Sequence, residues 1–109
     1  MTERYEPTGV PITARERELL TVLIEECAEV SQAACKLLRF GREVNPRTRV
    51  ANAEELALEV GDLRCVEQMM IEEGVIDATW VAIGRTRKRE RLAKYLQTDP
   101  DQHDGDHAR

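Results

Sequence analysis

Residues 14–39, ARERELLTVLIEECAEVSQAACKLLR, decide the fold of this chain. Thr13 and Glu16, at the start of the stretch, have the spacing of a capping box, in which each side chain accepts a hydrogen bond from the other residue's backbone N–H. Apolar residues then recur at helical intervals as far as Phe40-Gly41, where glycine favours the end of a helix. The stretch therefore predicts one long amphipathic helix.

Two further helices are predicted downstream. One covers about 53–73 and ends at Gly74, and the next begins at Asp77 and carries apolar residues as far as Leu96. Asn45-Pro46, between the first two helices, predicts a turn or short connector. No segment alternates β-branched and aromatic residues, as a strand would. We therefore expect an all-α fold of two long antiparallel helices, with a third that crosses or caps them.

Length and composition indicate one small domain with a thin core. The 109 residues are 41% hydrophobic but only 4% aromatic, so three helices leave apolar flanks exposed. We expect a helical bundle completed by homodimerisation, with a tetramer as the alternative. The domain is expected to span residues 1–97. Residues 98–109 are polar and acidic and lack an apolar anchor, which predicts a disordered tail.

Charge and cysteine usage narrow the function classes. With 16 basic and 21 acidic side chains the net charge is -5, which disfavours general binding to nucleic acid or to an anionic membrane. No signal peptide and no run of roughly 20 apolar residues is present, so no membrane association is expected. Cys27, Cys35 and Cys65 form no Cys-x-x-Cys pair and are interpreted as buried thiols in a reducing cytoplasm, the expected location.

Acidic residues on the two long helices are the most informative feature. At about 100° per residue, Glu25, Glu26 and Glu29 share one side of the first helix. Glu59 and Asp62 share a side of the second, with the same three-residue spacing as Glu26 and Glu29. If those sides meet, four carboxylates converge on one point.

Convergent carboxylates repel one another unless a cation lies between them. The histidines, His103 and His107, are both in the tail, so the Glu-x-x-His pattern of di-iron bundles is absent. All-oxygen ligands suit Mg²⁺, with Mn²⁺ as a second possibility. Gly61, inside the second acidic pair, costs about 1 kcal/mol relative to alanine in a helix, which predicts the close approach of a backbone or a phosphate.

The alternative is that these acids form a solvated helix face, because glutamate is a good helix former. The first acidic motif has no basic residue four positions on, which favours metal binding over this alternative. The remaining helical acids have no matched partners and are assigned to the surface; they are Glu54, Glu55, Glu72 and Glu73.

Glu25-Glu26-Cys27-Ala28-Glu29 and Glu59-Val60-Gly61-Asp62 resemble the Glu-Glu-x-x-Glu and Glu-x-x-Asp motifs of the MazG-like all-α nucleoside triphosphate pyrophosphohydrolases. Leu37-Leu38-Arg39-Phe40-Gly41 and Asn52 are similar to segments of the short phage-type and bacterial members. The resemblance covers about residues 19–80.

The resemblance implies Mg²⁺-dependent hydrolysis of a nucleoside triphosphate between its α and β phosphates, giving a monophosphate and pyrophosphate. The implied metal ligands are Glu26, Glu29, Glu59 and Asp62. The implied catalytic residues are Glu25, which would support the metal shell or orient the attacking water, and Glu26; which carboxylate removes the proton stays open. Such an enzyme would control or sanitise the nucleotide pool.

Several other side chains have two interpretations. Lys36 either contacts the triphosphate or extends over the bundle, and Lys88 is either a phosphate contact or part of a solvated basic run. Asn52 either contacts the substrate or caps a helix. The aromatic residues either stack on a base or belong to the core; they are Tyr5, Phe40 and Trp80.

Two rival functions remain open at this point. The chain is either a helical dimerisation or regulatory module without enzymatic activity, or a hydrolase of another phosphoanhydride such as an alarmone. The base and sugar of the nucleotide and the number of metal ions are not specified by any motif.

Overall fold

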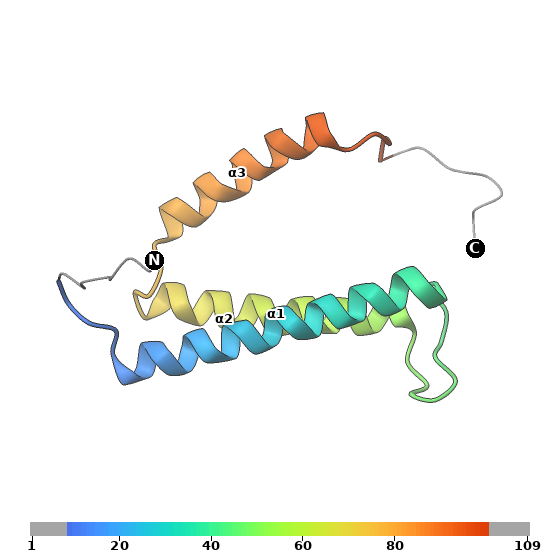
Figure 1. Ribbon diagram of the computed structural model, residues 1–109, viewed down its shortest axis with the longest axis horizontal. Coiled ribbons are helices and arrows are strands. Elements are labelled where there is room, and N and C mark those ends of the chain that lie inside the picture. The colour runs from blue at the N-terminus through green and yellow to red at the C-terminus, as the bar shows by residue number, and fades with distance from the viewer. Residues whose placement is uncertain (1–8, 101–109) are drawn as a thin grey trace, which may run out of the picture.

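The computed structural model describes residues 9–100, which form three helices (Figure 1). Helix α1 spans Ala14–Phe40, α2 spans Asn52–Glu72 and α3 spans Ala78–Tyr95. In this part of the chain no strand forms; the connector between α1 and α2 has only an isolated bridge between Val44 and Ala51. The predicted all-α fold is confirmed. Residues 101–109 of the predicted tail lie outside the described range.

Side chains fix the starts of α1 and α3. The Thr13 hydroxyl accepts a hydrogen bond from the Glu16 N–H at 3.0 Å, and the Glu16 carboxylate accepts one from the Thr13 N–H at 2.8 Å, so the predicted capping box is confirmed. Asp77 accepts a hydrogen bond from the Thr79 N–H at 2.7 Å. At the end of α1, Gly41 adopts a φ of 81°, which a side chain would disfavour.

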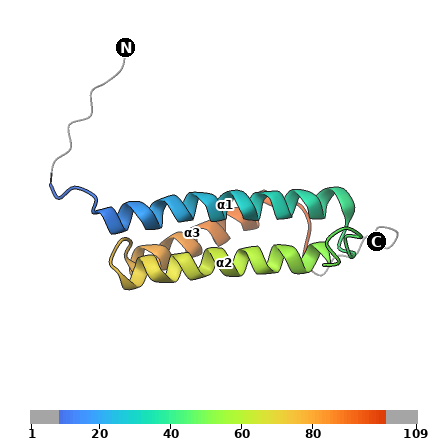
Figure 2. The ribbon, with the colours of Figure 1, turned by 90° about the horizontal axis from the view of Figure 1, so that it is seen from below.

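Helices α1 and α2 form an antiparallel hairpin (Figure 2). Its apolar core lies at the end where α1 begins and α2 finishes, around the buried Leu19, Val66 and Met70. At the same end the Arg15 guanidinium donates two hydrogen bonds of 2.8 Å to the Glu73 carboxylate. Glu73, which was predicted to be a surface acid without a partner, therefore has one. These contacts set the register in which the rest of α1 faces α2.

Helix α3 diverges from the hairpin and makes almost no packing contacts with it (Figure 1). Val75 and Ile76 pack against the hairpin core, and Gly74 turns the chain with a φ of 76°. None of the α3 residues is buried, so α3 neither crosses nor caps the hairpin within one chain as the sequence predicted. The short linker determines the direction of α3, because it fixes the chain immediately before Asp77.

The three cysteines are exposed, so the prediction of buried thiols is wrong for this chain. The reason is helical geometry: Cys27, Cys35 and Cys65 lie on sides of α1 and α2 that do not face the partner helix. Within residues 9–100 no helix has the length and apolar character needed to cross a membrane.

Replacing a core valine tests the hairpin packing. Val66 is 7% exposed and Val10 is 93% exposed, so Val66→Ala and Val10→Ala make the same truncation in opposite environments. We expect Val66→Ala to lower the free energy of unfolding by about 2 kcal/mol, because apolar contact is lost and a cavity remains. Val10→Ala is expected to change it by less than about 0.5 kcal/mol. Urea unfolding followed by circular dichroism measures both, and equal values would contradict this core.

Candidate metal centre

Three of the four predicted metal ligands meet in the middle of the hairpin. Glu26 of α1 and Glu59 and Asp62 of α2 each present one carboxylate oxygen, and these oxygens lie within 4.8 Å of one another. Glu26 and Glu59 are partly buried between the helices, whereas Asp62 is exposed. We call these three residues the acidic cluster. The antiparallel register produces it, because residues three apart on α2 share the side that faces α1.

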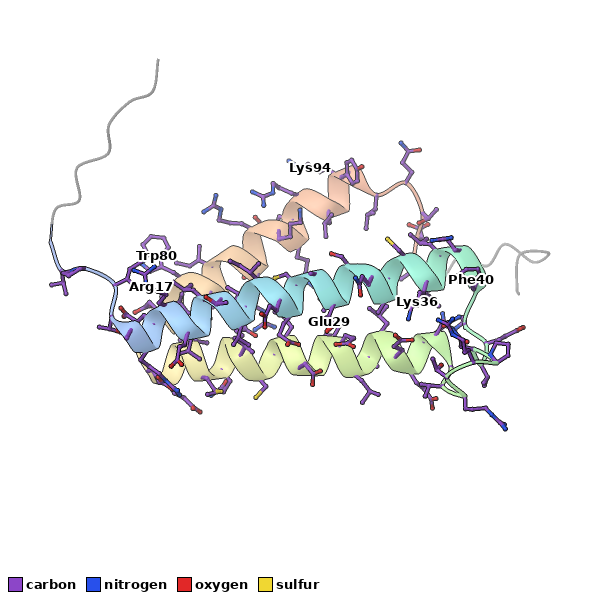
Figure 3. The ribbon with its side chains drawn as sticks, turned by 60° about the horizontal axis from the view of Figure 1, so that its bottom comes forward. Arg17, Glu29, Lys36, Phe40, Trp80 and Lys94 are labelled. Atoms are coloured by element: carbon purple, nitrogen blue, oxygen red, sulfur yellow. The ribbon has the colours of Figure 1, made fainter. Side chains whose placement is uncertain are left out.

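Glu29, the fourth predicted ligand, lies near the acidic cluster without joining it. Its side chain extends from α1 toward α2 in Figure 3, and its charge raises the pKa of Glu59. Glu25 is exposed and lies about 100° around α1 from Glu26, so it does not enter the cluster. Glu29 therefore interacts with the acidic cluster through its charge, whereas Glu25 of the same motif lies on an exposed side of α1.

The electrostatics of the acidic cluster are unfavourable for the chain alone. Partial desolvation between the helices raises the pKa of Glu59, and the charges of Glu29, Asp62, Glu26 and Glu55 raise it further. One oxygen of Glu26, Oε1, is buried and has no hydrogen-bond partner. Buried acceptors without a donor are rare in folded proteins, and a cation bound between the helices would satisfy this oxygen.

Lys36 and Glu55 form an ion pair across the hairpin, with 2.9 Å between Nζ and Oε2. Glu55 Oε1 is buried without a partner, so the prediction that Glu55 is simply a surface residue is wrong. Glu55, Glu59 and Asp62 follow one another at i, i+4 and i+7 and share one side of α2. That spacing was the sequence signal for Glu55. Lys36, which was predicted either to contact a phosphate or to extend over the bundle, thus pairs with Glu55 one turn of α2 before Glu59.

Asn52 lies at the end of the hairpin where the connector joins α1 to α2, and it is only 3% exposed. Its side-chain Nδ2 donates a hydrogen bond of 2.9 Å to the carbonyl of Gly41, and its backbone N–H donates one of 3.1 Å to the carbonyl of Glu43. The N-cap of α2 is Ala51, which makes no side-chain cap bond, so the capping role considered for Asn52 is wrong. Asn52 Oδ1 is buried and unpartnered, and it remains available for a donor.

Helix α3 places Lys88 apart from these residues. Lys88 is exposed and lines a hollow of about 1110 Å³ together with Arg85, Arg89 and Leu92, all from α3. Because α3 diverges from the hairpin, one chain does not bring Lys88 to the acidic cluster. Within a single chain, Lys88 therefore does not lie beside the acidic cluster, where its predicted phosphate contact would place it.

The aromatic and glycine predictions have mixed outcomes. Trp80 is 69% and Phe40 is 62% exposed, so neither belongs to the core of this chain. Tyr5 lies outside the described residues, as do His103 and His107. Outside its own helix, a Cβ added at Gly61 would meet no atom within 4 Å, so no other backbone within residues 9–100 approaches it closely.

The chain matches no protein-family model, no curated protein and no solved structure. The resemblance to the MazG-like pyrophosphohydrolases therefore depends on the motifs of the sequence.

Neutralising Glu59 tests the electrostatics of the acidic cluster. We expect Glu59→Gln to raise the free energy of unfolding at pH 7 in buffer containing EDTA, because the amide carries no charge for burial and neighbouring acids to oppose. Because folding raises the pKa of Glu59, the protonated side chain adds to the free energy of unfolding at low pH. This contribution is lost as the pH rises through the folded pKa. The advantage of the variant should therefore shrink as the pH falls through that pKa.

The matched control is Glu54→Gln, since Glu54 is exposed on the same helix. It is expected to give no gain in stability at any pH. Urea unfolding at a series of pH values measures both variants. A Glu59→Gln protein that unfolds like the wild type throughout would contradict a strained acidic cluster.

Proposed function

We propose that the hairpin binds Mg²⁺, or Mn²⁺ in its place, and hydrolyses nucleoside triphosphates to monophosphates and pyrophosphate. The observation that carries the proposal is the convergence of Glu26, Glu59 and Asp62 from two helices, with carboxylate oxygens within 4.8 Å. If these acids only formed a solvated helix face, carboxylates of α1 and α2 would have no reason to meet between the helices. The raised pKa of Glu59 supports the proposal, because it marks a charge that a divalent cation would stabilise.

Magnesium fits the donors on chemical grounds. All of them are carboxylate oxygens, and Mg²⁺ is typically held by one or two carboxylates while keeping positions for water and substrate phosphates. The acidic cluster would hold the ion, with Glu29 close enough to add charge or to bond one of its waters. Bound there, Mg²⁺ would neutralise phosphate oxygens and lower the pKa of water. An acidic chain could in this way bind a highly anionic substrate.

The residues around the acidic cluster have distinct proposed parts in the reaction. Water attacks the α-phosphorus, a new phosphorus–oxygen bond forms, and the bond from that phosphorus to the bridging oxygen breaks as pyrophosphate leaves. The proton of the water passes to a carboxylate, for which Glu25 and Glu26 are the candidates. Lys36 and Asn52 lie toward the end of the hairpin where the connector joins α1 to α2, and we propose that Lys36 contacts the substrate from there, with the buried Asn52 supporting the connector.

Metal binding is testable without substrate. We expect Mg²⁺ or Mn²⁺ to raise the melting temperature of the wild-type protein, by an amount that grows with concentration, because an ion that binds only the folded state stabilises it by mass action. Glu59→Gln and Asp62→Asn should lose most of this rise, and Glu54→Gln should keep it. Differential scanning fluorimetry gives the three comparisons. An equal rise in all variants would show that the ion binds elsewhere.

Activity is tested with a panel of ribo- and deoxyribonucleoside triphosphates in the presence and absence of Mg²⁺. We expect pyrophosphate and monophosphate as products, and a loss of kcat by about 100-fold or more in Glu26→Gln and Asp62→Asn, because each removes a proposed metal ligand. Glu54→Gln should retain wild-type turnover. Chromatography of the products identifies the bond that is broken.

The same panel separates the rival functions. Orthophosphate as the product would overturn cleavage between the α and β phosphates. Turnover of an alarmone alone would place the protein among hydrolases of another phosphoanhydride. No turnover of any nucleotide, together with no metal-induced stabilisation, would favour a helical module without enzymatic activity.

A further inference from the structure

Charge is distributed unevenly along this chain. Helix α2 carries six acids and one cation, whereas α3 carries six cations and one acid, Glu90. The net charge of -5, which disfavours binding to nucleic acid, therefore averages an acidic hairpin with a strongly basic helix. The cations of α3 are Arg85, Arg87, Lys88, Arg89, Arg91 and Lys94.

The cations of α3 gather at its projecting end. All of them lie within residues 85–94, which we call the basic segment, and all of their side chains are exposed. This part of α3 points away from the hairpin (Figure 1), and no acid of the hairpin forms an ion pair with it within residues 9–100. At physiological salt, charges are screened over about 8 Å, so a partner at this end of α3 responds mainly to the nearby cations.

Like charges within the basic segment weaken the helix when no anion is bound. Arg85 and Arg89 repel each other at i, i+4 spacing, and Arg87 and Arg91 do the same. An isolated helix of 18 residues is also marginal in water, because most helices depend on tertiary packing. A bound polyanion would remove the repulsion, so the charge of α3 favours an anionic partner.

The cations occupy two opposite sides of α3. At about 100° per residue, Arg85 and Arg89 lie within about 40° of each other. Arg87, Arg91 and Lys94 lie about 180° to 240° around the helix from the first of these. A flat anionic surface contacts only one of the two sides. A helix that lies on a membrane also presents one apolar face, whereas the basic segment contains a single large apolar side chain. The pattern therefore favours a partner that reaches both sides of the helix.

Duplex DNA offers two rows of phosphates at the separation that α3 requires. The major groove of B-DNA is about 12 Å wide and admits an α-helix, whose diameter with side chains is about 10–12 Å. A helix in the groove has one phosphate backbone on each side. The basic segment rises about 14 Å from Arg85 to Lys94, which matches about four base pairs of the duplex. On one side of α3, Arg85, Lys88 and Arg89 line the hollow of about 1110 Å³, which leaves space for phosphates beside them.

We propose that α3 docks in the major groove of duplex DNA. Arg85 and Arg89 contact the phosphates of one strand. Arg87, Arg91 and Lys94 contact the phosphates of the other strand. Because these contacts are to phosphates, they hold DNA of any sequence. The acidic α2 of a second copy would meet only one side of α3 and would leave the cations of the other side exposed. The proposal goes beyond nucleotide hydrolysis and involves no residue of the acidic cluster.

Fluorescence anisotropy with a labelled DNA duplex of about 20 base pairs tests the proposal. We expect the full chain, in buffer with EDTA, to bind the duplex with a dissociation constant of about 1–100 µM at physiological salt, the range of non-specific binding. The logarithm of the association constant should fall with the logarithm of the salt concentration with a slope of about -5, because the phosphate contacts release counterions. EDTA removes divalent cations, so the result does not depend on the proposed hydrolysis.

Two double variants test the two sides of α3 separately. One is Arg85→Gln, Arg89→Gln, and the other is Arg87→Gln, Arg91→Gln. Each should raise the dissociation constant for DNA by about tenfold or more and make the salt slope shallower by about 2, because each removes two phosphate contacts. Glutamine is a good helix former, and circular dichroism checks that both variants keep their helices.

The matched control is Arg42→Gln, Arg47→Gln, which removes two cations from exposed positions of the connector. It should bind DNA as the wild type does, and an equal loss in all three double variants would overturn the proposed docking. Absence of binding by the wild type at about 100 µM, or a loss in only one of the two α3 variants, would overturn it as well. Binding to phosphatidylglycerol vesicles without binding to DNA would assign α3 to a membrane instead. Protection of residues 85–94 from hydrogen exchange before DNA is added would show that a second copy covers them, which would also contradict the proposal.

Discussion

Carboxylates held between α1 and α2 are the constraint on which this structure depends. Glu26 and Glu59 are partly buried in a space that also contains Asp62, and together with Glu29 and Glu55 these acids repel one another. Such a site persists only because the hairpin is fixed elsewhere. Leu19, Val66 and Met70 form the apolar core at one end, and the Arg15–Glu73 pair closes the same end.

The hairpin is divided into an end with the apolar core and a middle with the acidic cluster, and the two differ in their effect on stability. The apolar core sets the register, and the register forces the acids of α1 and α2 to face each other. Replacement of Glu59 by a neutral residue is expected to stabilise the folded chain, and stabilising replacements of this kind are easy to find in proteins. An unfavourable arrangement of charges held by a core elsewhere is what the proposed metal site would require.

The helices and the centre of the site were predictable because both depend on local spacing. The capping box at Thr13 and Glu16 and the glycine at position 41 mark the bounds of α1, and the 3.6-residue period places Glu59 and Asp62 on one side of α2. Glu55 and Asn52 were missed or misread because their roles depend on residues far away in sequence. The partner of Glu55 is Lys36, and that of Asn52 is the carbonyl of Gly41.

The direction of α3 was not predictable for a related reason. Apolar residues gather in the first half of α3 and cations in the second, without a clear amphipathic face along its length, so its sequence pattern does not select a side of the hairpin. The linker decides instead, through the anchoring of Val75 and Ile76 and the positive φ of Gly74. The cysteines are exposed because a single chain covers only the sides of α1 and α2 that face each other.

The position of Lys36 explains why the charge of the acidic cluster remains uncompensated. Lys36 is on the same side of α1 as Glu29, but its ammonium bonds Glu55, one turn of α2 before Glu59. One positive charge therefore balances one carboxylate at the edge and leaves the three central ones unbalanced. A second lysine would neutralise only one of them, and its long side chain would need space between the helices. A divalent cation carries two charges in a much smaller volume and accepts oxygen ligands from both helices, so it matches the excess charge and the geometry together.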